Sequence, residues 1–512
     1  MKAWLENLLK TKVDSKPERG DYSVNLHRVL VGKDVLVAVY SNKEFKKYFD
    51  DPELTKNGFA NFYLSSDFLR QQILKIISEK ASYGSGESKK FSINLEFVSA
   101  NPTGPLTVGN ARAASYGDAL GNILKKAGYE VAKEYYINDV GVQVRKLADS
   151  IKLRMRELGG EKIEFSPDLY QGEYIRSMAK EFMERLIPDE EIKAEAIRVM
   201  ISGAKETLDH LGVGFDNWFS ESELHKDGKV QTVILDLESK GYVLEEDGAK
   251  WLKIDEGQKA VLIKSDGSTT YLMNDIAYTK DKFERGFDKA INIWGTDHHG
   301  DVIRLKAGVT ALGYEALRLE ILLHQLVVLK QKDERLKISK RAGNLVLLED
   351  LINDVGKDGV RFFFLSKDLN THMEFDIDLA KERSNKNPIY YIQYAHARLS
   401  NIFQKLSIDP KIFKIEEENL RPLEKPEELA LIRKMVKFPE LVEDVANSYQ
   451  VHRLAQYSYE LASDFHNFYE KHHVVQENNK ELERARLALC SAVKIVLGQC
   501  LSLMGISAPE KM

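Results

Sequence analysis

Apolar and polar positions follow different periods along the chain and divide it into three parts. Residues 1–82 mix short strand-like and helix-like patterns. In residues 91–383, short apolar runs alternate with helical patterns, which is typical of a parallel α/β domain. In residues 384–512, strand-like runs are almost absent and long amphipathic patterns follow one another. This last part is therefore predicted to be an all-helical bundle.

Two other segments refine this division. Residues 83–90, YGSGESKK, are rich in Gly and Ser and are predicted to be a linker. Residues 146–245 are mostly helical and charged, which indicates an insertion in the α/β domain. Strand patterns then return at residues 259–264, 269–273 and 289–295. The whole pattern predicts a multidomain α/β protein.

Size and composition narrow the class of protein. A chain of 512 residues is too long for one core, so two or three domains are expected. Its hydrophobic content of 43% and charged content of 30% are those of an ordinary globular protein. The net charge of −5 argues against non-specific nucleic-acid binding over the whole surface, although a local basic face stays open.

The cysteines and the apolar segments indicate in which cellular compartment the protein is expected and whether it spans a membrane. Cys490 and Cys500 are the only cysteines, which argues against a disulfide framework and a Cys-based zinc site and fits a reducing cytoplasm. The first residues, MKAWLENLLKTKVD, are too short and too charged for a signal peptide. The longest apolar stretch, 487–506, contains Lys494 and Gln499, so it is predicted to be a buried bundle helix, not a membrane span.

A loop at residues 101–114 is the first candidate for chemistry. It follows the strand pattern FSINLEFV (91–98) and leads into a helix pattern from Ala111 to Ala127, with Gly128 as its C-cap. A second strand pattern, EVAKEYYI, follows. In such a β-α-β unit the free N–H groups at the helix start form an anion site at the ligand-binding edge of the sheet. A plain turn is the alternative, and the dinucleotide and P-loop glycine patterns are both absent.

A second loop, LKISKRAGN (336–344), lies far downstream. Its cations are Lys337, Lys340 and Arg341, and they stand beside Ser339, Gly343 and Asn344. Such a loop can close over a polyphosphate and stabilise the charge of a leaving group. A solvated charge run is the alternative, but the combination with the first loop in one α/β domain favours a nucleotide site.

The two loops resemble the signatures of class I aminoacyl-tRNA synthetases, specifically arginyl-tRNA synthetases of the bacterial type. The segment EFVSANPTGPLTVGNAR resembles the first signature of this family, and KISKRAGN resembles the second. Other stretches match in order, namely EYYINDVGVQV, YLMNDIAYTKDKFERGFDKAINIWGTDHHGD and EFDIDLAKERSNKNPIYYIQYAHARLSNIF. The C-terminal helical domain is matched by ELASDFHNFYEKHHVV and LMGISAPEKM, and the N-terminal domain, which is short for the family, by KPERGDYSVN and NGFANFYLS.

The resemblance implies a fold and domain roles. The fold is a Rossmann-like parallel-sheet catalytic domain with a helical insertion, between a small α+β N-terminal domain and an all-α C-terminal bundle. The N-terminal domain would touch the elbow of the tRNA, and the bundle would bind its anticodon side.

The resemblance also assigns residues to ligands. ATP would be met by Pro102, Thr107, Gly109, Asn110, Asp297, His298, Ile338, Ser339 and Lys340. Catalysis would rest on Thr107, Asn110, Lys337 and Lys340. Arginine would be bound by Glu96, Ser99, Asn101, Tyr271 and Asp275.

The chemistry of the arginine pocket agrees with its residue types. A guanidinium is a rigid fork of donors that carboxylates bind bidentately, and Glu96 and Asp275 are carboxylates expected at separate strand ends. Tyr271 offers a ring and a hydroxyl. A glutamate substrate would be repelled. The alternative for Asp275 is the N-cap of a helix that begins at IAYTKDKFE.

The chain departs from the family at the first signature, where Thr107 and Asn110 replace two histidines. Thr offers an O–H and Asn an N–H, so hydrogen-bond donation survives while a possible positive charge is lost. Either the site is active with neutral donors, or the protein binds tRNA without activating an amino acid. The complete KISK sequence and the paired carboxylates favour activity.

The bundle has its own candidate residues. Asn387 and Pro388 predict a helix start. Tyr390, Tyr394 and Arg398 follow within three turns and could stack on unpaired bases, although packing against the catalytic domain is an equal alternative.

The expected function is ATP-dependent attachment of L-arginine to tRNA(Arg) through an arginyl-adenylate, with Mg²⁺ accompanying ATP and no zinc. The resemblance further implies that tRNA must bind before arginine is activated efficiently. We expect a cytoplasmic monomer that binds no membrane. The alternatives are a non-catalytic tRNA-binding paralogue, a small-molecule nucleotidyltransferase of related fold, and another class I synthetase with a different pocket.

Overall fold

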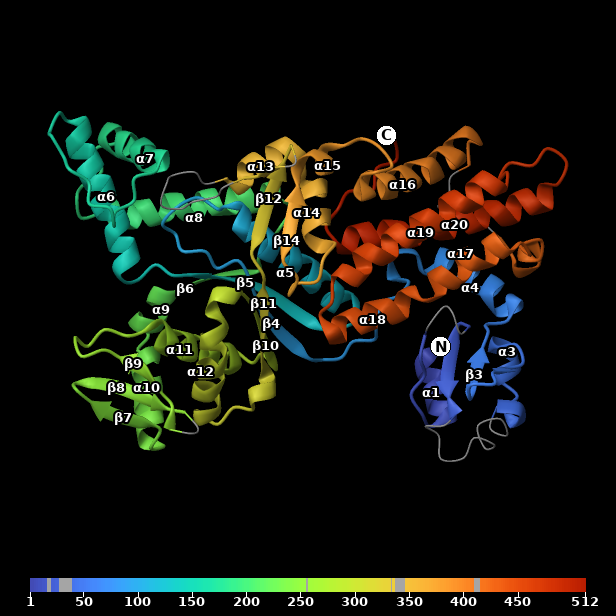
Figure 1. The fold of residues 1–512 in the computed structure, drawn as a ribbon, viewed down its shortest axis with the longest axis horizontal. Coiled ribbons are helices and arrows are strands. Elements are labelled where there is room, and N and C mark those ends of the chain that lie inside the picture. Colours follow the sequence, from blue (N-terminus) through green and yellow to red (C-terminus); the bar gives the residue numbers. More distant parts are fainter. Residues whose placement is uncertain (16–19, 27–38, 255–256, 333, 337–345, 409–414) are drawn as a thin grey trace.

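The computed structural model describes residues 1–15, 20–26, 39–254, 257–332, 334–336, 346–408 and 415–512. A parallel sheet occupies the middle of the molecule (Figure 1). The C-terminal helices lie on one side of it, and an insertion and a small antiparallel sheet lie on the other.

The central sheet has five strands in the order β11-β10-β4-β5-β6, and every neighbouring pair is parallel. The strands are β4 (Ser92–Glu96), β5 (Glu130–Ile137), β6 (Asn217–Ser220), β10 (Lys289–Gly295) and β11 (Leu319–His324). The predicted parallel α/β domain is confirmed. The predictions of a strand at 130–137 and at 289–295 agree with β5 and β10.

Helix α5 (Val108–Lys126) crosses between this sheet and the C-terminal helices and is buried along most of its length. It begins three residues before the predicted start at Ala111, because Thr107 and Asn110 cap its first turn. Gly128, with φ +93°, follows its end, as a left-handed position requires. A Cβ at Gly117 would lie 2.2 Å from the ring of Phe97, so this glycine lets α5 approach the end of β4.

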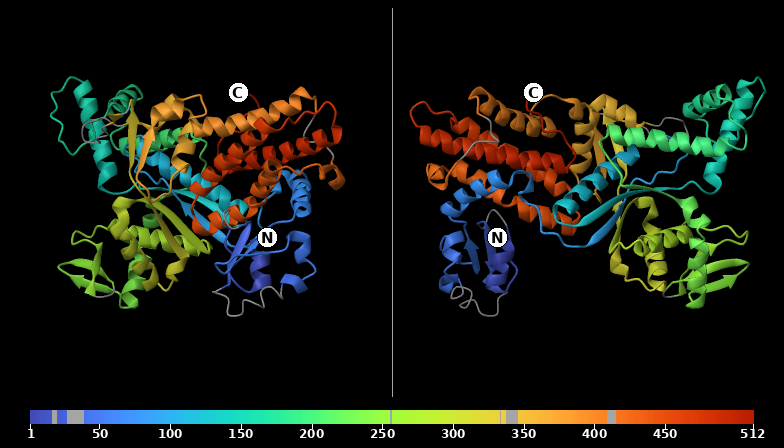
Figure 2. Two further views of the ribbon diagram at one scale, coloured as in Figure 1. Left: turned by 45° about the vertical axis from the view of Figure 1, so that its right-hand side comes forward. Right: turned by 180° about the vertical axis from the view of Figure 1, so that it is seen from behind.

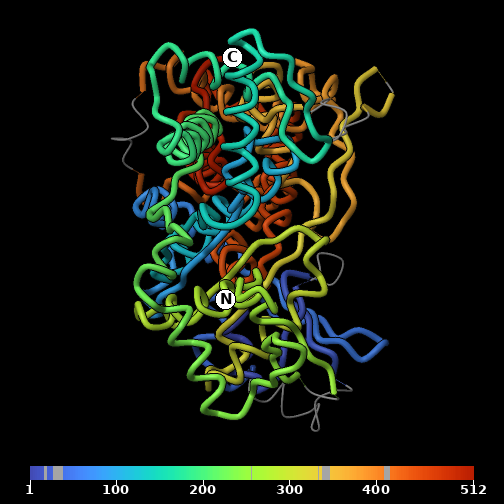
Figure 3. Tube along the Cα trace, turned by 90° about the vertical axis from the view of Figure 1, so that its left-hand side faces the viewer, coloured from blue at the N-terminus to red at the C-terminus, as the bar shows by residue number. Residues whose placement is uncertain are grey.

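Three helices project from the sheet after β5: α6 (Val142–Leu158), α7 (Glu173–Glu184) and α8 (Ile192–His210). Figure 3 shows the molecule from this side, with the projecting helices above and a small antiparallel sheet below. Strand β6 lies within the range predicted as a helical insertion, yet it forms the edge of the central sheet.

The small antiparallel sheet has the order β7-β8-β9, with β7 at Val243–Glu246, β8 at Ala249–Lys253 and β9 at Lys259–Ile263. Two predictions need correction here. The run 259–264 forms β9, but in this antiparallel sheet and not in the parallel one. The run 269–273 is not a strand.

Residues 269–273 instead lead into α11 (Tyr271–Glu284). The Thr270 side chain accepts a hydrogen bond from the Met273 N–H and caps the helix, so a Thr pair that is typical of strands serves here as a helix start. Helices α9 (Glu221–Lys226), α10 (Lys229–Ser239) and α12 (His299–Ala311) complete this region.

A second sheet, β13-β12-β14, follows the central one, and its edge strand β13 spans Glu334–Arg335. Strand β12 (Val327–Gln331) pairs in parallel with β14 (Met373–Asp376). Between them lie α13 (Leu348–Val355) and α14 (Lys357–Leu365), and α14 packs on α5.

The C-terminal part is a helical bundle, as predicted. Its helices, here called the helical domain, are α16 (Pro388–Lys405), α17 (Pro426–Val436), α18 (Phe438–Ser448), α19 (His452–Lys471) and α20 (Lys480–Leu503). Helix α16 starts with Asn387 as its cap and Pro388 at its first position, which confirms that prediction. Among the described helices only α20 is long and apolar enough to cross a membrane, and 72% of its apolar window is buried inside the protein.

The N-terminal part forms a three-stranded antiparallel sheet, β1-β3-β2, with β1 at Tyr22–Asn25, β2 at Glu53–Leu54 and β3 at Phe59–Phe62. It lies beneath the helical domain in both views of Figure 2. Helix α4 (Ser66–Glu79) packs against α17 and α20.

Candidate active site

The first signature loop lies between the carboxyl end of β4 and the start of α5. The chain leaves β4 through Val98 and Ser99, which have φ of +69° and +38°. Positive φ is costly for a β-branched residue and is often found where a functional site fixes the backbone. Pro102 is buried, and it lines a hollow between this loop and α8.

Thr107 and Asn110 cap α5 through each other. The Asn110 Oδ1 accepts from the Thr107 N–H at 3.0 Å and from the Thr107 hydroxyl at 3.2 Å. The Thr107 hydroxyl is therefore already used within the loop. The Asn110 amide nitrogen has no hydrogen-bond partner among the described residues, so it remains able to donate to a ligand. Gly109 lies exposed between them.

The second signature falls outside the described residues, and this includes Lys337, Ile338, Ser339 and Lys340. The residues that follow it are described. The Val108 N–H donates to the Val346 carbonyl at 3.1 Å, and the Leu348 N–H donates to the Leu106 carbonyl at 3.0 Å. Residues 346–348, which follow the second signature in sequence, therefore pair with the first loop.

Glu96, at the end of β4, is buried and has two partners. Its Oε1 accepts from the Ser99 hydroxyl at 2.9 Å, and its Oε2 accepts from the Lys282 ammonium at 2.7 Å. The side chain of Lys282 is fully buried and also donates to Asn292 at 2.9 Å. Ser99 thus holds Glu96, and Lys282 offsets the charge of Glu96.

Asp275 lies in the second turn of α11. It is therefore not at a strand end, as we expected, and it is not an N-cap, because Thr270 holds that position. In the described part of the chain its carboxylate has no hydrogen-bond or ion-pair partner. Burial, followed by the negative charges of Glu96 and Glu221, raises the pKa of Asp275 well above its usual range. A cationic ligand would reverse that shift.

Tyr271 and Asn101 are connected through Gln143. The Asn101 amide donates to the Gln143 Oε1 at 2.9 Å, and the Gln143 amide donates to the Tyr271 hydroxyl at 3.4 Å. Tyr271 is 60% exposed, so its ring and hydroxyl are accessible to a ligand. Gln143, at the start of α6, is a site residue that the sequence did not single out.

Glu221, the first residue of α9, was also missed. It is buried, and its two oxygens accept from the Tyr136 hydroxyl at 2.9 Å and the Asn274 amide at 2.8 Å. Burial raises the pKa of Glu221 to about 7. In the sequence WFSESELHK nothing distinguishes this glutamate from an ordinary residue of a first helical turn.

Asp297 and His298 are exposed in a short turn directly after β10. The His298 Nδ1 lies 3.4 Å from Asp301. Because β10 is the neighbour of β4 in the sheet, this turn and the first loop share one edge. His324 ends β11 at the same edge, and burial lowers its pKa. This is where open parallel sheets bind ligands.

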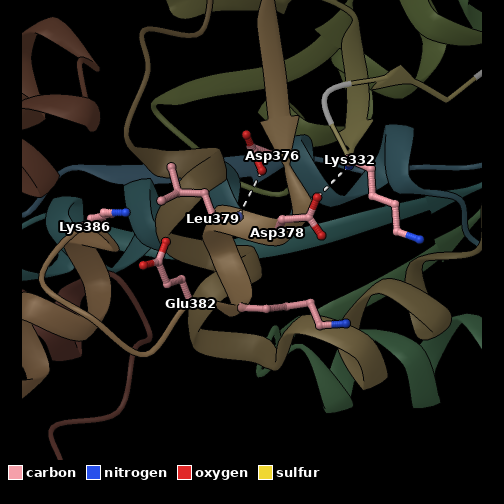
Figure 4. Close-up of a pocket in the computed structure, with 7 residues that line it drawn as sticks. Lys332, Asp376, Asp378, Leu379, Glu382 and Lys386 are labelled. Atoms are coloured by element: carbon pink, nitrogen blue, oxygen red, sulfur yellow. Dashed lines mark hydrogen bonds between the residues drawn. The ribbon is translucent and has the colours of Figure 1, made fainter.

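A larger cavity, of about 650 Å³, lies elsewhere, over β14 and α15 (Ile377–Lys381). Figure 4 shows the residues that line it, which are Lys332, Asp376, Asp378, Leu379, Lys381, Glu382 and Lys386. The Lys332 N–H donates to Asp378 at 2.6 Å. None of the predicted arginine- or ATP-binding residues lines this cavity.

The three candidate tRNA-binding residues form one cluster on α16. The rings of Tyr390 and Tyr394 are stacked, with centroids 6.2 Å apart. The Arg398 guanidinium lies 4.6 Å from the centre of the Tyr394 ring and 4.9 Å from that of Tyr469 in α19. The cluster is partly exposed, and its members also pack on one another.

The sheet order, the loops at its carboxyl edge and the helical domain beside it are those of a class I aminoacyl-tRNA synthetase. A family model described as "tRNA synthetases class I (R), catalytic domain" matches residues 72–367. A second, "DALR anticodon binding domain", matches residues 392–512.

Similar proteins specify the family. The Arginine--tRNA ligase of Bacillus velezensis is 41% identical, over 96% of this chain and 92% of the relative. A solved chain from Campylobacter jejuni is 35% identical, has a TM-score of 0.81 and is matched over 88% of this chain and 100% of its own length. Thermus thermophilus arginyl-tRNA synthetase shares the fold, with a TM-score of 0.78 over 100% of this chain and 99% of that one at 21% identity. The chain belongs to the arginyl-tRNA synthetases.

Proposed function

We propose that this chain joins L-arginine to tRNA(Arg) with ATP, and that arginine binds between Asp275, Tyr271 and the end of β4. The observation that carries this assignment is the Asp275 carboxylate, which is half-buried, lies within the influence of the Glu96 and Glu221 charges and has no partner among the described residues. A guanidinium would supply two parallel donors and a positive charge to this carboxylate.

Glu221 joins the pocket in this proposal. With Lys282 offsetting Glu96, the excess negative charge of the pocket comes from Asp275 and Glu221. A lysine substrate would bring the charge but not the planar fork, and a glutamate substrate would be repelled. Asn101, linked to Tyr271 through Gln143, is assigned to the main-chain end of the substrate.

ATP is assigned to the carboxyl edge of the sheet. The start of α5 supplies N–H groups and the Asn110 amide, and Lys337 and Lys340 of the second signature supply positive charge on the pyrophosphate side. Asp297 and His298 flank the other side of the nucleotide. Magnesium enters with ATP as part of the substrate, and we assign no side chain to it.

The reaction has two steps. The arginine carboxylate attacks the α-phosphate of ATP in line, which forms arginyl-adenylate and releases pyrophosphate. The 2′-hydroxyl of the terminal adenosine of the tRNA then attacks the adenylate carbonyl and releases AMP. The protein contributes position and charge and no covalent nucleophile, as is usual in phosphoryl chemistry.

The tRNA is assigned to the helical domain, with Tyr390, Tyr394 and Arg398 as candidate contacts, and to the N-terminal part. The buried free thiols of Cys490 and Cys500 fit a reducing compartment, so we propose a cytoplasmic enzyme. We also propose that it acts as a monomer, which light scattering during size-exclusion chromatography would test.

The test is charging of total bacterial tRNA with ATP, Mg²⁺ and labelled arginine, with labelled lysine and glutamate as controls. Charging with arginine alone is expected, and it would also establish that Thr107 and Asn110 can replace the family's histidines. A folded protein that binds tRNA but charges none of the three amino acids would instead be a non-catalytic paralogue. The similarity to Arginine--tRNA ligases over nearly the whole chain does not favour that alternative.

A further inference from the structure

Arg361, in α14, is fully buried, and its guanidinium connects three parts of the chain. Its Nε donates to the Met504 carbonyl, at the end of α20, at 2.7 Å. Its Nη1 donates to the carbonyls of Leu211 and Gly212, after α8, at 3.3 and 3.2 Å. Its Nη2 donates to the Asp118 carboxylate, in α5, at 2.5 Å.

Asp118 is the point where this connection reaches α5. Its other oxygen accepts from the Lys133 ammonium, in β5, at 2.6 Å. Asn122, one turn further along α5, donates to Asp118 at 3.4 Å and to the Leu503 carbonyl at 3.3 Å. One turn of α5 is therefore bound to the sheet on one side and to the end of the helical domain on the other.

A second contact strengthens this link. The Tyr116 hydroxyl, also in α5, donates to the Tyr449 carbonyl at the end of α18. The Tyr449 hydroxyl accepts from Lys289, in β10, at 2.9 Å. Helix α5 thus contacts the helical domain at two places, both within about 18 Å of Asn110 at 1.5 Å of rise per residue.

Gly505 follows α20 and lies directly against Arg361. Its φ is +66°, and a Cβ there would be 2.3 Å from the Arg361 Nη2. Any other residue would have to displace the buried guanidinium from Asp118. Because the chain at Gly505 lies against the Arg361 guanidinium, a shift of the chain at the end of α20 would also shift Arg361.

We propose that Arg361 is a positioning residue for the use of ATP: together with Gly505 it fixes α5, and so the first signature loop, to the end of the helical domain. The proposal rests on the function proposed above, because it takes the first turn of α5 to hold ATP. A buried helix moves as a rigid body, so a shift at Asp118 reaches Asn110. A misplacement of about 1 Å can cost on the order of 100-fold in rate.

The test compares Gly505→Ala with Gly313→Ala. Gly313 follows α12 as Gly505 follows α20, and its φ is +95°, but no atom lies within 4 Å of its Cβ position. Both variants bear the strain of alanine at positive φ, and only Gly505→Ala displaces Arg361. At a temperature where both are folded, Gly505→Ala is expected to lower kcat/KM for ATP at least about 10-fold. The KM for tRNA should change less than about twofold.

Equal kcat/KM values for ATP in the two glycine variants would overturn the proposal. A merely structural role of Gly505 would lower the melting temperature, but it would not lower kcat/KM for ATP while leaving the KM for tRNA nearly unchanged. If Gly505→Ala does not fold, Asn122→Ala removes the link to Leu503 without leaving a buried charge unpaired. Its expected loss in kcat/KM for ATP is about 2- to 12-fold, and an unchanged value would likewise overturn the proposal. If Asn110→Ala also leaves ATP kinetics unchanged, the proposed ATP site itself is at fault.

Discussion

Two carboxylates beside the central sheet, Glu134, which is buried, and Asp275, which is half-buried, have opposite surroundings. Glu134, on β5, accepts two hydrogen bonds from Arg285, at 2.7 and 2.8 Å, and one from the Tyr278 hydroxyl at 2.5 Å. Asn94 and Asn217 donate to it as well. Asp275, on α11, has no such donor among the described residues.

The pKa values diverge accordingly. Burial alone raises the pKa of Glu134, but the hydrogen bonds from Arg285, the charges of Lys282 and Arg285 and the hydrogen bond from Tyr278 outweigh burial and lower the pKa to about 2. For Asp275, burial and the negative charges of Glu96 and Glu221 outweigh the positive charge of Lys282, so its pKa is raised. A buried charge that is fully paired stabilises the fold, whereas a carboxyl whose pKa is raised and which lacks a partner is a candidate for a binding site.

The largest expected effect comes from breaking the paired carboxylate. Glu134→Gln leaves Arg285 without its bidentate partner and should lower the free energy of unfolding by about 3–5 kcal/mol. Urea unfolding at pH 7 would measure the change. Glu161→Gln is the matched control, because Glu161 pairs with Arg156 on the surface, and no measurable change is expected there. If the two variants were equally stable, Glu134 would not be the anchor inferred here.

Removing the Asp275 carboxylate should have the opposite effects, which are a loss of activity and no loss of stability. Asp275→Asn is expected to lower kcat/KM for arginine about 10- to 100-fold, since a hydrogen bond to a charged group contributes about 1.5–3 kcal/mol. The melting temperature should stay the same or rise, because the substitution removes no hydrogen bond or ion pair that the Asp275 carboxylate makes with the described residues. Charging assays at varied arginine, alongside a thermal melt, measure both. An unchanged arginine KM would remove Asp275 from the pocket.

The pH dependence of stability gives a further test, at a third carboxylate near Asp275. Glu221 belongs to the proposed arginine pocket, and burial raises its pKa from 4.5 to about 7. Between these values the folded protein holds a proton that the unfolded chain releases, so the contribution of Glu221 to stability falls as the pH rises from about 4.5 to about 7. Compared with the Glu221→Gln variant, the free energy of unfolding of the wild type should fall by on the order of 1 kcal/mol per pH unit across this window.

Thermal or urea unfolding of both proteins between pH 5 and 8 would test this slope. Saturating arginine should flatten it, because a bound cation favours the ionised carboxylate. Parallel curves for the two proteins would show that Glu221 does not titrate in this range.

The sequence predicted the larger features of the fold because they rest on local patterns. Alternating strands and helices predict the parallel sheet, and amphipathic periods predict the bundle. The strand prediction at 269–273 was wrong because a Thr pair suits both a strand and a helix cap, and only the contacts after residue 270 decide between them. Asp275 was singled out from family resemblance, while its location in the second turn of α11 was not predicted.

Other site residues depend on contacts between distant segments. Lys282 meets Glu96 from 186 positions away, and Arg361 meets Asp118 from 243 positions away. Glu221 has no motif around it, and its importance follows only from the fold that places Tyr136 and Asn274 against it. No periodicity within one segment encodes such pairs.

The smallest expected effect concerns the Asn110 side chain, in which the oxygen and the amide nitrogen have different surroundings. The Asn110 oxygen caps α5, whereas its amide nitrogen has no partner in the described structure and is assigned to ATP. Asn110→Ala should therefore lower kcat/KM for ATP about 2- to 12-fold, the range for a neutral hydrogen bond of about 0.5–1.5 kcal/mol. Thr107→Ala should lower it less, because the Thr107 hydroxyl already donates to Asn110. Both variants weaken the same cap, so similar melting temperatures with different ATP kinetics would separate capping from nucleotide binding. A larger loss in Thr107→Ala would show that its hydroxyl turns to ATP in the reaction and that the resting contact with Asn110 is not the working one.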